Sequence, residues 1–273
     1  MAPPLRVTPE QQGAIEQASN SDSVQKCRVI VVIDPGHGDH NNKTSGVDPG
    51  ALGGANLEYK ESAIVLDVAK VFKEKLAAKT DVIEAVYLTR EGDVGSGELK
   101  KLQWRLDFAN EKKAQILVSL HMNSACKRDP NDRDKCLKDA NGNEVLDTAA
   151  NGKEVWCFPG KPQSKSLATA IMAAYTLPLK LRHASNGGVL ESRFTVLKIE
   201  GTLKASALIE MGFIPNENDR TQVMNNKTSI AEQFTAGVVN YIIANRAELC
   251  GGDTGTTKLP ANPPIPQPRP KDL

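Results

Sequence analysis

The sequence has no long apolar run and almost no net charge, and each absence excludes a class of protein. None of the 273 residues falls in a stretch that is long and apolar enough to span a bilayer. The formal net charge of +1 provides no long-range attraction to nucleic acid or to an anionic membrane. Residues 1–23 also lack the basic-then-apolar order of a signal peptide. An export signal has therefore been removed, or the protein leaves its cell by another route, or it stays inside.

Several motifs that would indicate other catalytic chemistries are also missing. The sequence contains no G-x-S-x-G nucleophile motif, no Walker motif and no dinucleotide-binding glycine pattern. Its five cysteines include no C-x-x-C pair, which argues against a cysteine zinc site. The search for a functional site therefore turns to histidines and carboxylates.

The cysteine positions allow two interpretations. Cys27 precedes the first predicted strand and Cys250 follows the last predicted helix, so a disulfide between them could join the ends of the domain. Cys126 and Cys157 bracket a polar insertion that contains Cys136. Disulfides would indicate an oxidising compartment, but scattered reduced thiols are equally compatible with the sequence. The odd number leaves at least one thiol unpaired within the chain.

The length and the distribution of polar residues predict one domain with two tails. Residues 1–26 form a polar leader, in which 9–18 is a candidate short helix. Residues 27–250 form the predicted domain, and residues 251–273 are a Pro-rich tail that we expect to be extended or disordered. The polar insertion at 125–153 has no apolar periodicity, so we interpret it as a solvated surface loop rather than a binding arm.

Within the domain, β-branched runs alternate with segments of helical periodicity. This alternation predicts an α/β fold with a mostly parallel sheet. The predicted strands are 28–33, 82–89, 115–120, 154–158, 195–199 and 205–210, and the predicted helices are 58–78, 98–113, 164–175 and 230–246. The segments 38–56 and 183–193 are predicted to be loops.

Two histidines follow apolar strands in the same way. His37 follows the apolar run at 28–33 and the turn residues Asp34-Pro35-Gly36. His121 directly follows the apolar run at 115–120. Neighbouring parallel strands place their carboxyl ends at one edge of the sheet, where ligands bind in open α/β folds. Glu61, in the first turn of the intervening helix, can face the same edge. The three side chains are therefore expected to converge.

Two histidines and one carboxylate are a familiar ligand set for catalytic zinc, with the fourth position left to water. Hydrolysis then requires an acid/base, for which Glu210 at the end of the strand 205–210 is the candidate. Each residue also has a structural interpretation. His37 could be a turn histidine, Glu61 a helix-start carboxylate favoured by the macrodipole, and Glu210 an ion-paired acid. These interpretations do not explain why the polar residues that interrupt the apolar runs all fall at the same edge of the predicted sheet.

The remaining histidines and the tryptophans are weaker candidates. His40 and His183 lie in polar loops and are expected to be solvated, although His183 is also a candidate for substrate contact. Trp104 and Trp156 lie in a predicted helix and a predicted strand, where core packing is the simpler explanation.

Taken together, these motifs resemble the zinc-dependent N-acetylmuramoyl-L-alanine amidases of the amidase-3 family, which cleave the amide between the peptidoglycan glycan and its stem peptide. The resemblance covers residues 29–246, in the family's order. It is carried by Val32-Ile33-Asp34-Pro35-Gly36-His37-Gly38, Asp48-Pro49-Gly50-Ala51, Lys60-Glu61, Leu88-Thr89-Arg90, 105–110, Ser119-Leu120-His121-Met122-Asn123, 194–197 and Ile209-Glu210-Met211-Gly212-Phe213-Ile214 with Asn216.

The resemblance implies a mostly parallel twisted sheet with helices on both faces. It also implies that His37, Glu61 and His121 bind Zn²⁺ and that Glu210 is the catalytic acid/base. Asn123 would orient a ligand or substrate, and Asp34 would support the metal ligands from outside the coordination sphere.

The sequence departs from the family pattern at two segments. The insertion after Ser124 is longer than usual and could form part of the cleft wall. The segment 161–193 is compact and lacks the long helical insertion that blocks the zinc site in division-linked relatives. We therefore expect an enzyme that is not autoinhibited.

The expected activity is hydrolysis of the amide between N-acetylmuramic acid and L-alanine, in the periplasm or outside the cell. The alternatives are a phage lysin or an antibacterial effector with the same chemistry, and a zinc peptidase acting on another wall amide. A catalytically inactive wall-binding module is disfavoured by the complete residue set. The expected partners are peptidoglycan and an activator or immunity protein, without nucleic acid, and the chain is expected to be a monomer.

Overall fold

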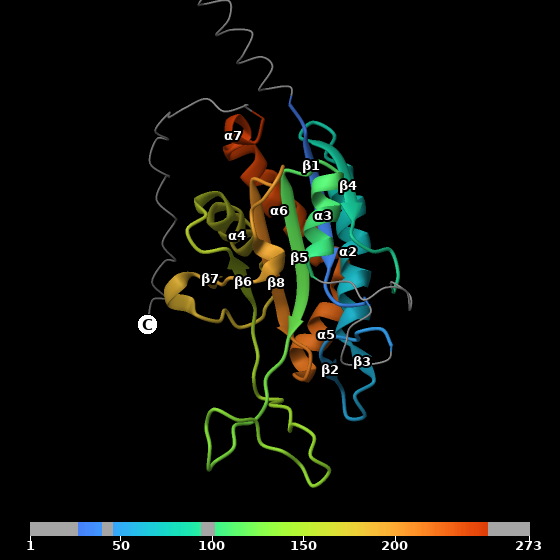
Figure 1. Ribbon diagram of the computed structural model, residues 1–273, viewed down its shortest axis with the longest axis vertical. Helices are drawn as coiled ribbons and strands as arrows, with labels where there is room; N and C mark the ends of the chain where they lie inside the picture. Colours follow the sequence, from blue (N-terminus) through green and yellow to red (C-terminus); the bar gives the residue numbers. More distant parts are fainter. Residues whose placement is uncertain (1–26, 40–45, 94–101, 251–273) are drawn as a thin grey trace, which may run out of the picture.

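The computed structural model describes residues 27–39, 46–93 and 102–250 (Figure 1). The predicted leader, its helix at 9–18, the Pro-rich tail and His40 lie outside the described residues. No helix in the described ranges has both the length and the apolar character that crossing a bilayer requires.

A six-stranded sheet forms the centre of the molecule. Four strands run parallel to one another, and β6 and β7, which are parallel to each other, run antiparallel to their neighbour β8. The sheet is therefore mostly parallel, as predicted. Its order is β4 (Ile83–Leu88), β1 (Val29–Pro35), β5 (Ile116–Asn123), β8 (Ala205–Phe213), β6 (Glu154–Cys157) and β7 (Val189–Glu191). A separate two-stranded sheet joins β2 (Leu52–Gly53) to β3 (Tyr59–Lys60).

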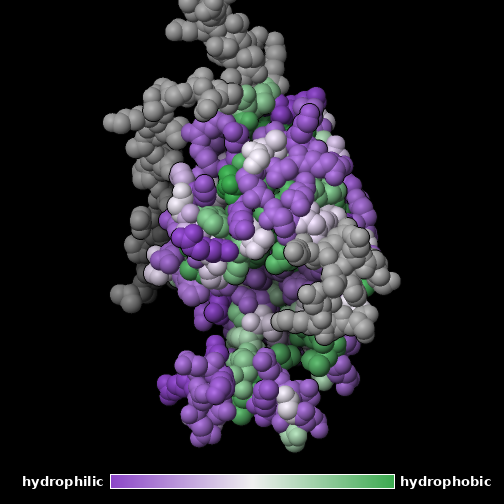
Figure 2. Space-filling view, in the orientation of Figure 1, coloured by the Kyte–Doolittle hydropathy of each residue, from purple (hydrophilic) through white to green (hydrophobic). Residues whose placement is uncertain are grey.

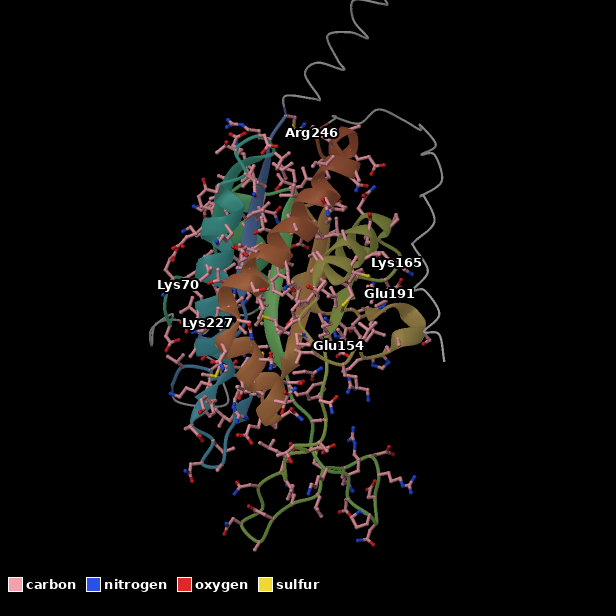
Figure 3. All side chains as sticks on the ribbon, turned by 180° about the vertical axis from the view of Figure 1, so that it is seen from behind. Lys70, Glu154, Lys165, Glu191, Lys227 and Arg246 are labelled. Carbon is pink, nitrogen blue, oxygen red and sulfur yellow. A yellow bond between two sulfur atoms is a disulfide. The ribbon has the colours of Figure 1, made fainter. Side chains whose placement is uncertain are left out.

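Helices cover both faces of the sheet. Three long helices pack on one face and bury a large apolar cluster, and Figure 3 shows α2 and α6 lying across that face. They are α2 (Glu61–Ala77), α4 (Pro162–Ala174) and α6 (Lys227–Ala244). A smaller cluster lies on the opposite face under α3 (Gln103–Glu111) and the 3-10 turn η2 (Thr195–Leu197). The short elements α5 (Glu217–Asn225), α7 (Arg246–Cys250) and η1 (Ala184–Asn186) complete the fold.

The sequence pattern explains the central strands and α2. Six of the seven residues of β1 are buried, because helices cover both faces of this interior strand. Along α2 the apolar residues recur at helical spacing, and Ile64, Val68 and Phe72 are buried on the side that faces the sheet. Burial of these side chains fixes the first turn of α2 near the carboxyl ends of β1 and β5.

The polar insertion projects beyond the carboxyl end of β5 and returns to the start of β6 (Figure 1). Isolated antiparallel bridges join its arms, including Cys126 to Leu146 and Lys138 to Glu144. Its visible surface is mainly hydrophilic (Figure 2). These features are compatible with the interpretation of the insertion as a surface elaboration.

Two disulfides form within the described residues. Cys27 is bonded to Cys250 across a sequence separation of 223 residues, so this bridge joins the two ends of the domain. Cys126 is bonded to Cys136 inside the insertion, and Cys157 is a free, buried thiol in β6. The thiol that must remain unpaired is therefore in the core and not on the surface.

Four local predictions differ from the structure. The predicted loop 38–56 contains the short strand β2. Residues 195–199 do not form a strand, because Val196 and Leu197 both bury in the smaller cluster through the turn η2. The predicted loop 183–193 contains the short edge strand β7. The helix α5 was not predicted; its cap Asn216 accepts a hydrogen bond from the backbone N–H of Asp219.

Candidate metal centre and cleft

The carboxyl edge of the sheet brings three of the predicted residues together. His37 lies two residues beyond the end of β1, Glu61 is the first residue of α2, and His121 lies in β5 before the strand ends. Nε2 of His37 is 3.2 Å from one carboxylate oxygen of Glu61, and Nδ1 of His121 is 2.9 Å from the other. One donor atom from each residue lies within 4.8 Å of the others, so the group can hold a metal ion.

Glycines allow this close approach. His37 itself adopts a left-handed backbone with a φ of 58°, which is unusual for a residue with a side chain. A Cβ at Gly36 would collide with the ring of His121, and a Cβ at Gly50 would collide with His37 and Glu61. Only glycine at these two positions leaves room for the three donor side chains.

Two buried arginines hold the turn that carries His37. Arg90 donates hydrogen bonds to the carbonyl oxygens of Gly36 (2.8 Å) and Ser62 (2.7 Å), and so joins the His37 turn to the start of α2. Arg105, from α3, donates to the carbonyl oxygen of His37 at 2.9 Å. The guanidinium groups therefore help to fix the backbone of this turn, beyond the single bond from the backbone N–H of Gly36 to the carbonyl oxygen of Leu120 in β5.

Asp34 supplies the negative charge that balances Arg105. Its carboxylate accepts hydrogen bonds from Thr89 (2.6 Å), from Ser119 (2.7 Å) and from Arg105. Burial alone would raise the pKa of Asp34, but Arg105 and the two hydroxyl groups outweigh it and hold the pKa below its usual value. Asp39 lies 3.3 Å from Arg105 and completes this buried network.

The candidate centre is built to stabilise positive charge. Nδ1 of His37 lies 2.8 Å from Asp48, and Glu61 accepts backbone N–H groups from Ala51 (2.8 Å) and Met122 (3.0 Å). Burial lowers the pKa of His37, but the carboxylates of Asp48 and Glu61 outweigh it and raise the pKa to about 10. Burial opposes ionisation of Glu61 as well, yet both histidines lower its pKa. The same carboxylates would stabilise a cation bound at this point. The donor set therefore fits a divalent metal.

Glu210 stands next to this group in the sheet. It pairs in register with His121 of β5 on one side and with Glu154 of β6 on the other, which places the three side chains on one face. Its Oε2 atom is buried and has no hydrogen-bond partner among the described residues. Burial and the charges of Glu61 and Glu154 raise the pKa of Glu210 well above its usual value, although His37 opposes the shift. This carboxyl group can therefore both accept and release a proton.

The candidate centre opens into a cleft with a volume of about 550 Å³. The expectation that the polar insertion forms part of the cleft wall is wrong, because no lining residue comes from 125–153. The insertion instead projects away from the sheet (Figure 1). The cleft is lined by Asp34, Gly36, His37, Asp39, Asp48, Leu102, Arg105, His121, Arg193, Phe194, Thr195, Val196, Leu208 and Glu210.

The weaker candidates Asn123, His183, Trp104 and Trp156 lie outside the donor group. Asn123 donates a hydrogen bond to Glu154 at 2.7 Å, and His183 is exposed and lies 3.5 Å from Glu154. Neither residue lines the cleft. Trp104 and Trp156 are partly buried, and their indole N–H groups donate to Asp39 and Glu154, each at 3.3 Å. Trp156 packs against the smaller apolar cluster.

Four residues near the site received no role from the sequence alone. Asp48 precedes a Pro-Gly turn, and that turn was the one available sign that it lies near the site. Arg90 and Arg105 fall in recognised segments, but the sequence does not reveal that their charges are buried. Glu154 is also buried, and its position beside Glu210 follows from the antiparallel pairing of β6, which was not predicted.

The chain is similar in sequence to known cell wall amidases. An uncharacterised cell wall amidase of Bacillus anthracis is 27% identical over 221 residues, which cover 77% of this chain and 35% of that protein. The N-acetylmuramoyl-L-alanine amidase LytC of Bacillus subtilis is 29% identical over 213 residues, with the same two coverages, 77% and 35%. The chain thus aligns with about a third of the length of these curated relatives.

A solved structure supports the same relationship. The crystal structure of an N-acetylmuramoyl-L-alanine amidase from Clostridium difficile 630 superimposes with a TM-score of 0.56 at 27% identity, covering 80% of this chain and 96% of that one. The profile of the Amidase_3 family, described as N-acetylmuramoyl-L-alanine amidase, matches residues 31–240. These residues contain the sheet except for the first two residues of β1, and they include both candidate histidines, Glu61 and Glu210. The chain therefore belongs to the Amidase_3 family of N-acetylmuramoyl-L-alanine amidases.

Proposed function

We propose that this protein is a zinc-dependent amidase that hydrolyses the bond between N-acetylmuramic acid and the L-alanine of peptidoglycan stem peptides. One observation carries the proposal: His37, Glu61 and His121 converge at the wall of a cleft that also contains Glu210, whose free carboxylate oxygen is buried. Membership of the Amidase_3 family supports the choice of substrate.

The residues present fit a zinc ion. His37, Glu61 and His121 would be the protein ligands, a set that leaves one position of a tetrahedral ion open. Asp48 would keep the Nδ1 proton of His37 in place, so that Nε2 presents its lone pair to the metal. Bound zinc would supply Lewis acidity, which polarises a carbonyl group and makes water a stronger acid.

Glu210 would act as the acid/base. As a base it accepts the proton of the attacking water, and as an acid it delivers that proton to the nitrogen that leaves with the stem peptide. Its raised pKa suits both steps, because a carboxyl group that is not strongly acidic accepts a proton more readily. Among the residues that the structure describes, Oε2 has no hydrogen-bond partner, which leaves that oxygen available for this transfer.

The biological setting follows from the disulfides and the substrate. The Cys27–Cys250 and Cys126–Cys136 bridges require an oxidising compartment, which supports the periplasm or the cell exterior. A wall-remodelling enzyme, a phage lysin and an antibacterial effector would all act there. An effector would in addition require an immunity protein that covers the cleft.

The segment that follows β6 supports activity without an activator. Between α4 and the turn η2 the chain contains only η1 and the short strand β7, and His37, His121 and Glu210 all line an open cleft. The purified protein, tested as a monomer, should therefore digest sacculi with no partner added. Activity that begins only after an activator is supplied would contradict this part of the proposal.

The test combines product analysis with removal of the metal. Purified protein is incubated with sacculi, and the soluble products are identified by mass spectrometry. Glycan with free lactyl groups and intact stem peptides are expected; cleavage within the peptides would instead identify a zinc peptidase. A chelator should abolish the reaction and zinc should restore it, whereas activity in metal-free protein would refute zinc dependence. Absence of any product from the zinc-loaded protein would favour the wall-binding module.

A further inference from the structure

The charged groups that line the cleft are unevenly balanced. The acids on one side have cationic partners, since Asp39 lies 3.3 Å from Arg105 and Asp48 lies 2.8 Å from His37. Arg193 lines the same cleft, but among the described residues it has neither an ion-pair partner nor a hydrogen-bond acceptor. The cleft therefore contains a cation whose charge is not balanced within the part of the chain that the structure describes.

Aromatic side chains support this arginine. The guanidinium carbon of Arg193 lies 5.9 Å from the ring centre of Phe158, which packs on the smaller apolar cluster. The adjacent Phe194 is 41% exposed and contacts Trp156 edge to face, with 5.5 Å between the ring centres. A guanidinium group that rests on an aromatic ring keeps its in-plane N–H groups available for a planar anion such as a carboxylate.

The chemistry of the substrate indicates which group this anion is. An N-acetylated glycan carries hydroxyl and acetamido groups, which are neutral, so the ionised carboxylates of a muramoyl peptide belong to its peptide. We propose that Arg193 binds a free carboxylate of the stem peptide, close to the scissile amide, and thereby selects acidic stem peptides over amidated ones. This inference rests on the proposed amidase function and adds a specificity residue to it.

The proposed contact should affect binding more than chemistry. Arg193 comes from the segment between β7 and η2, whereas the donor residues and Glu210 come from the turn after β1, the start of α2, β5 and β8. An interaction that is equally strong in the bound substrate and in the transition state lowers KM and leaves kcat unchanged. Removal of Arg193 should therefore raise KM mainly for the acidic substrate.

The experiment uses the zinc-loaded full chain and two synthetic muramoyl dipeptides. Both dipeptides have one carboxyl group of the second residue blocked as an amide, and they differ only at its other carboxyl group, which is either a free carboxylate or a carboxamide. A hydrogen-bonded charge pair should give the acidic dipeptide an advantage of about tenfold in kcat/KM. R193Q should remove this preference by raising KM for the acidic dipeptide about tenfold, with a much smaller effect on the amidated dipeptide, and R193K should keep part of the preference. K198Q is the matched control, since Lys198 is an exposed cation nearby that does not line the cleft.

The outcomes separate this inference from the function on which it rests. Equal hydrolysis of the two dipeptides by the unmodified protein would overturn the role of Arg193 but leave the amidase function intact. An equal loss on both dipeptides in R193Q would also overturn it. Hydrolysis of neither dipeptide would refute the amidase function, and this inference with it. Thermal unfolding of R193Q at the unmodified temperature would show that the exposed substitution leaves the fold intact.

Discussion

Nδ1 of His37 lies 2.8 Å from Oδ2 of Asp48, and this contact fixes the ring so that Nε2 faces Glu61. Asp48 also accepts the backbone N–H of Gly50 at 3.0 Å, so its own carboxylate is held in place. A carboxylate behind a ligating histidine fixes the tautomer of the ring and increases its basicity. The affinity for metal should therefore depend on a residue that is not itself a ligand.

The D48N substitution tests this dependence. The amide keeps the size of the side chain but removes the negative charge, so the affinity for zinc should fall by about 10- to 100-fold. Competition with a fluorescent zinc chelator measures the change directly, without reference to catalysis. D81N provides the control, because Asp81 is an exposed carboxylate that does not line the cleft. Equal zinc affinities for D48N and D81N would contradict the proposed role of Asp48.

The E210Q substitution separates metal binding from proton transfer. Glutamine fills the same space but cannot accept a proton, so turnover on sacculi should fall by roughly 100- to 10,000-fold. Zinc content, measured by elemental mass spectrometry, should stay at the level of the unmodified protein, since Glu210 is not part of the donor group. Loss of zinc together with activity would identify Glu210 as a ligand and not as the acid/base.

The sequence predicted the central sheet and the convergence of the candidate donor residues because both depend on local patterns. Buried parallel strands are continuous apolar runs, and the break after such a run shows where a side chain reaches the edge of the sheet. His37 and His121 were located in this way. The same rule fails at Thr195–Leu197, where Val196 and Leu197 bury their side chains from the 3-10 turn η2 and not from a strand.

The supporting residues could not be predicted because their roles depend on contacts between distant segments. Arg105 lies 71 residues from Asp34 in sequence, and nothing in its helical surroundings shows that the guanidinium is buried. Glu154 lies beside Glu210 only because β6 runs antiparallel to β8. The helix α5 is mostly polar, so its apolar periodicity is too weak to detect.

The two disulfides should contribute unequally to stability. The Cys27–Cys250 bridge closes 223 residues, and the chain-entropy argument assigns such a loop about 5 kcal/mol. The Cys126–Cys136 bridge spans only 10 residues within the insertion, which lies apart from the sheet (Figure 1). The C27S/C250S variant should therefore unfold at a clearly lower temperature, while C126S/C136S should mainly increase proteolytic cleavage within 125–153. Equal decreases in unfolding temperature would contradict this difference.

The buried pair of Asp34 and Arg105 should make stability depend on pH in a defined direction. The pKa of Asp34 is lower in the folded protein than its ordinary value of 3.8. The charged carboxylate therefore stabilises the fold fully above that value, and the stabilisation is lost as the pH falls through the lower folded pKa. Removing this charge leaves Arg105 with a weaker set of partners, so D34N should lose roughly 3–5 kcal/mol of unfolding free energy at pH 7.

Urea denaturation of metal-free protein at pH 7, 5 and 3 measures this effect. The stability difference between the unmodified protein and D34N should be similar at pH 7 and 5 and should shrink at pH 3, where Asp34 begins to be protonated in the unfolded state. D67N is the matched control, because Asp67 forms an exposed ion pair with Lys227 at 2.5 Å. Its substitution should change stability by less than about 1 kcal/mol. A difference for D34N that stays constant from pH 7 to 3 would show that Asp34 contributes through packing and not through its charge.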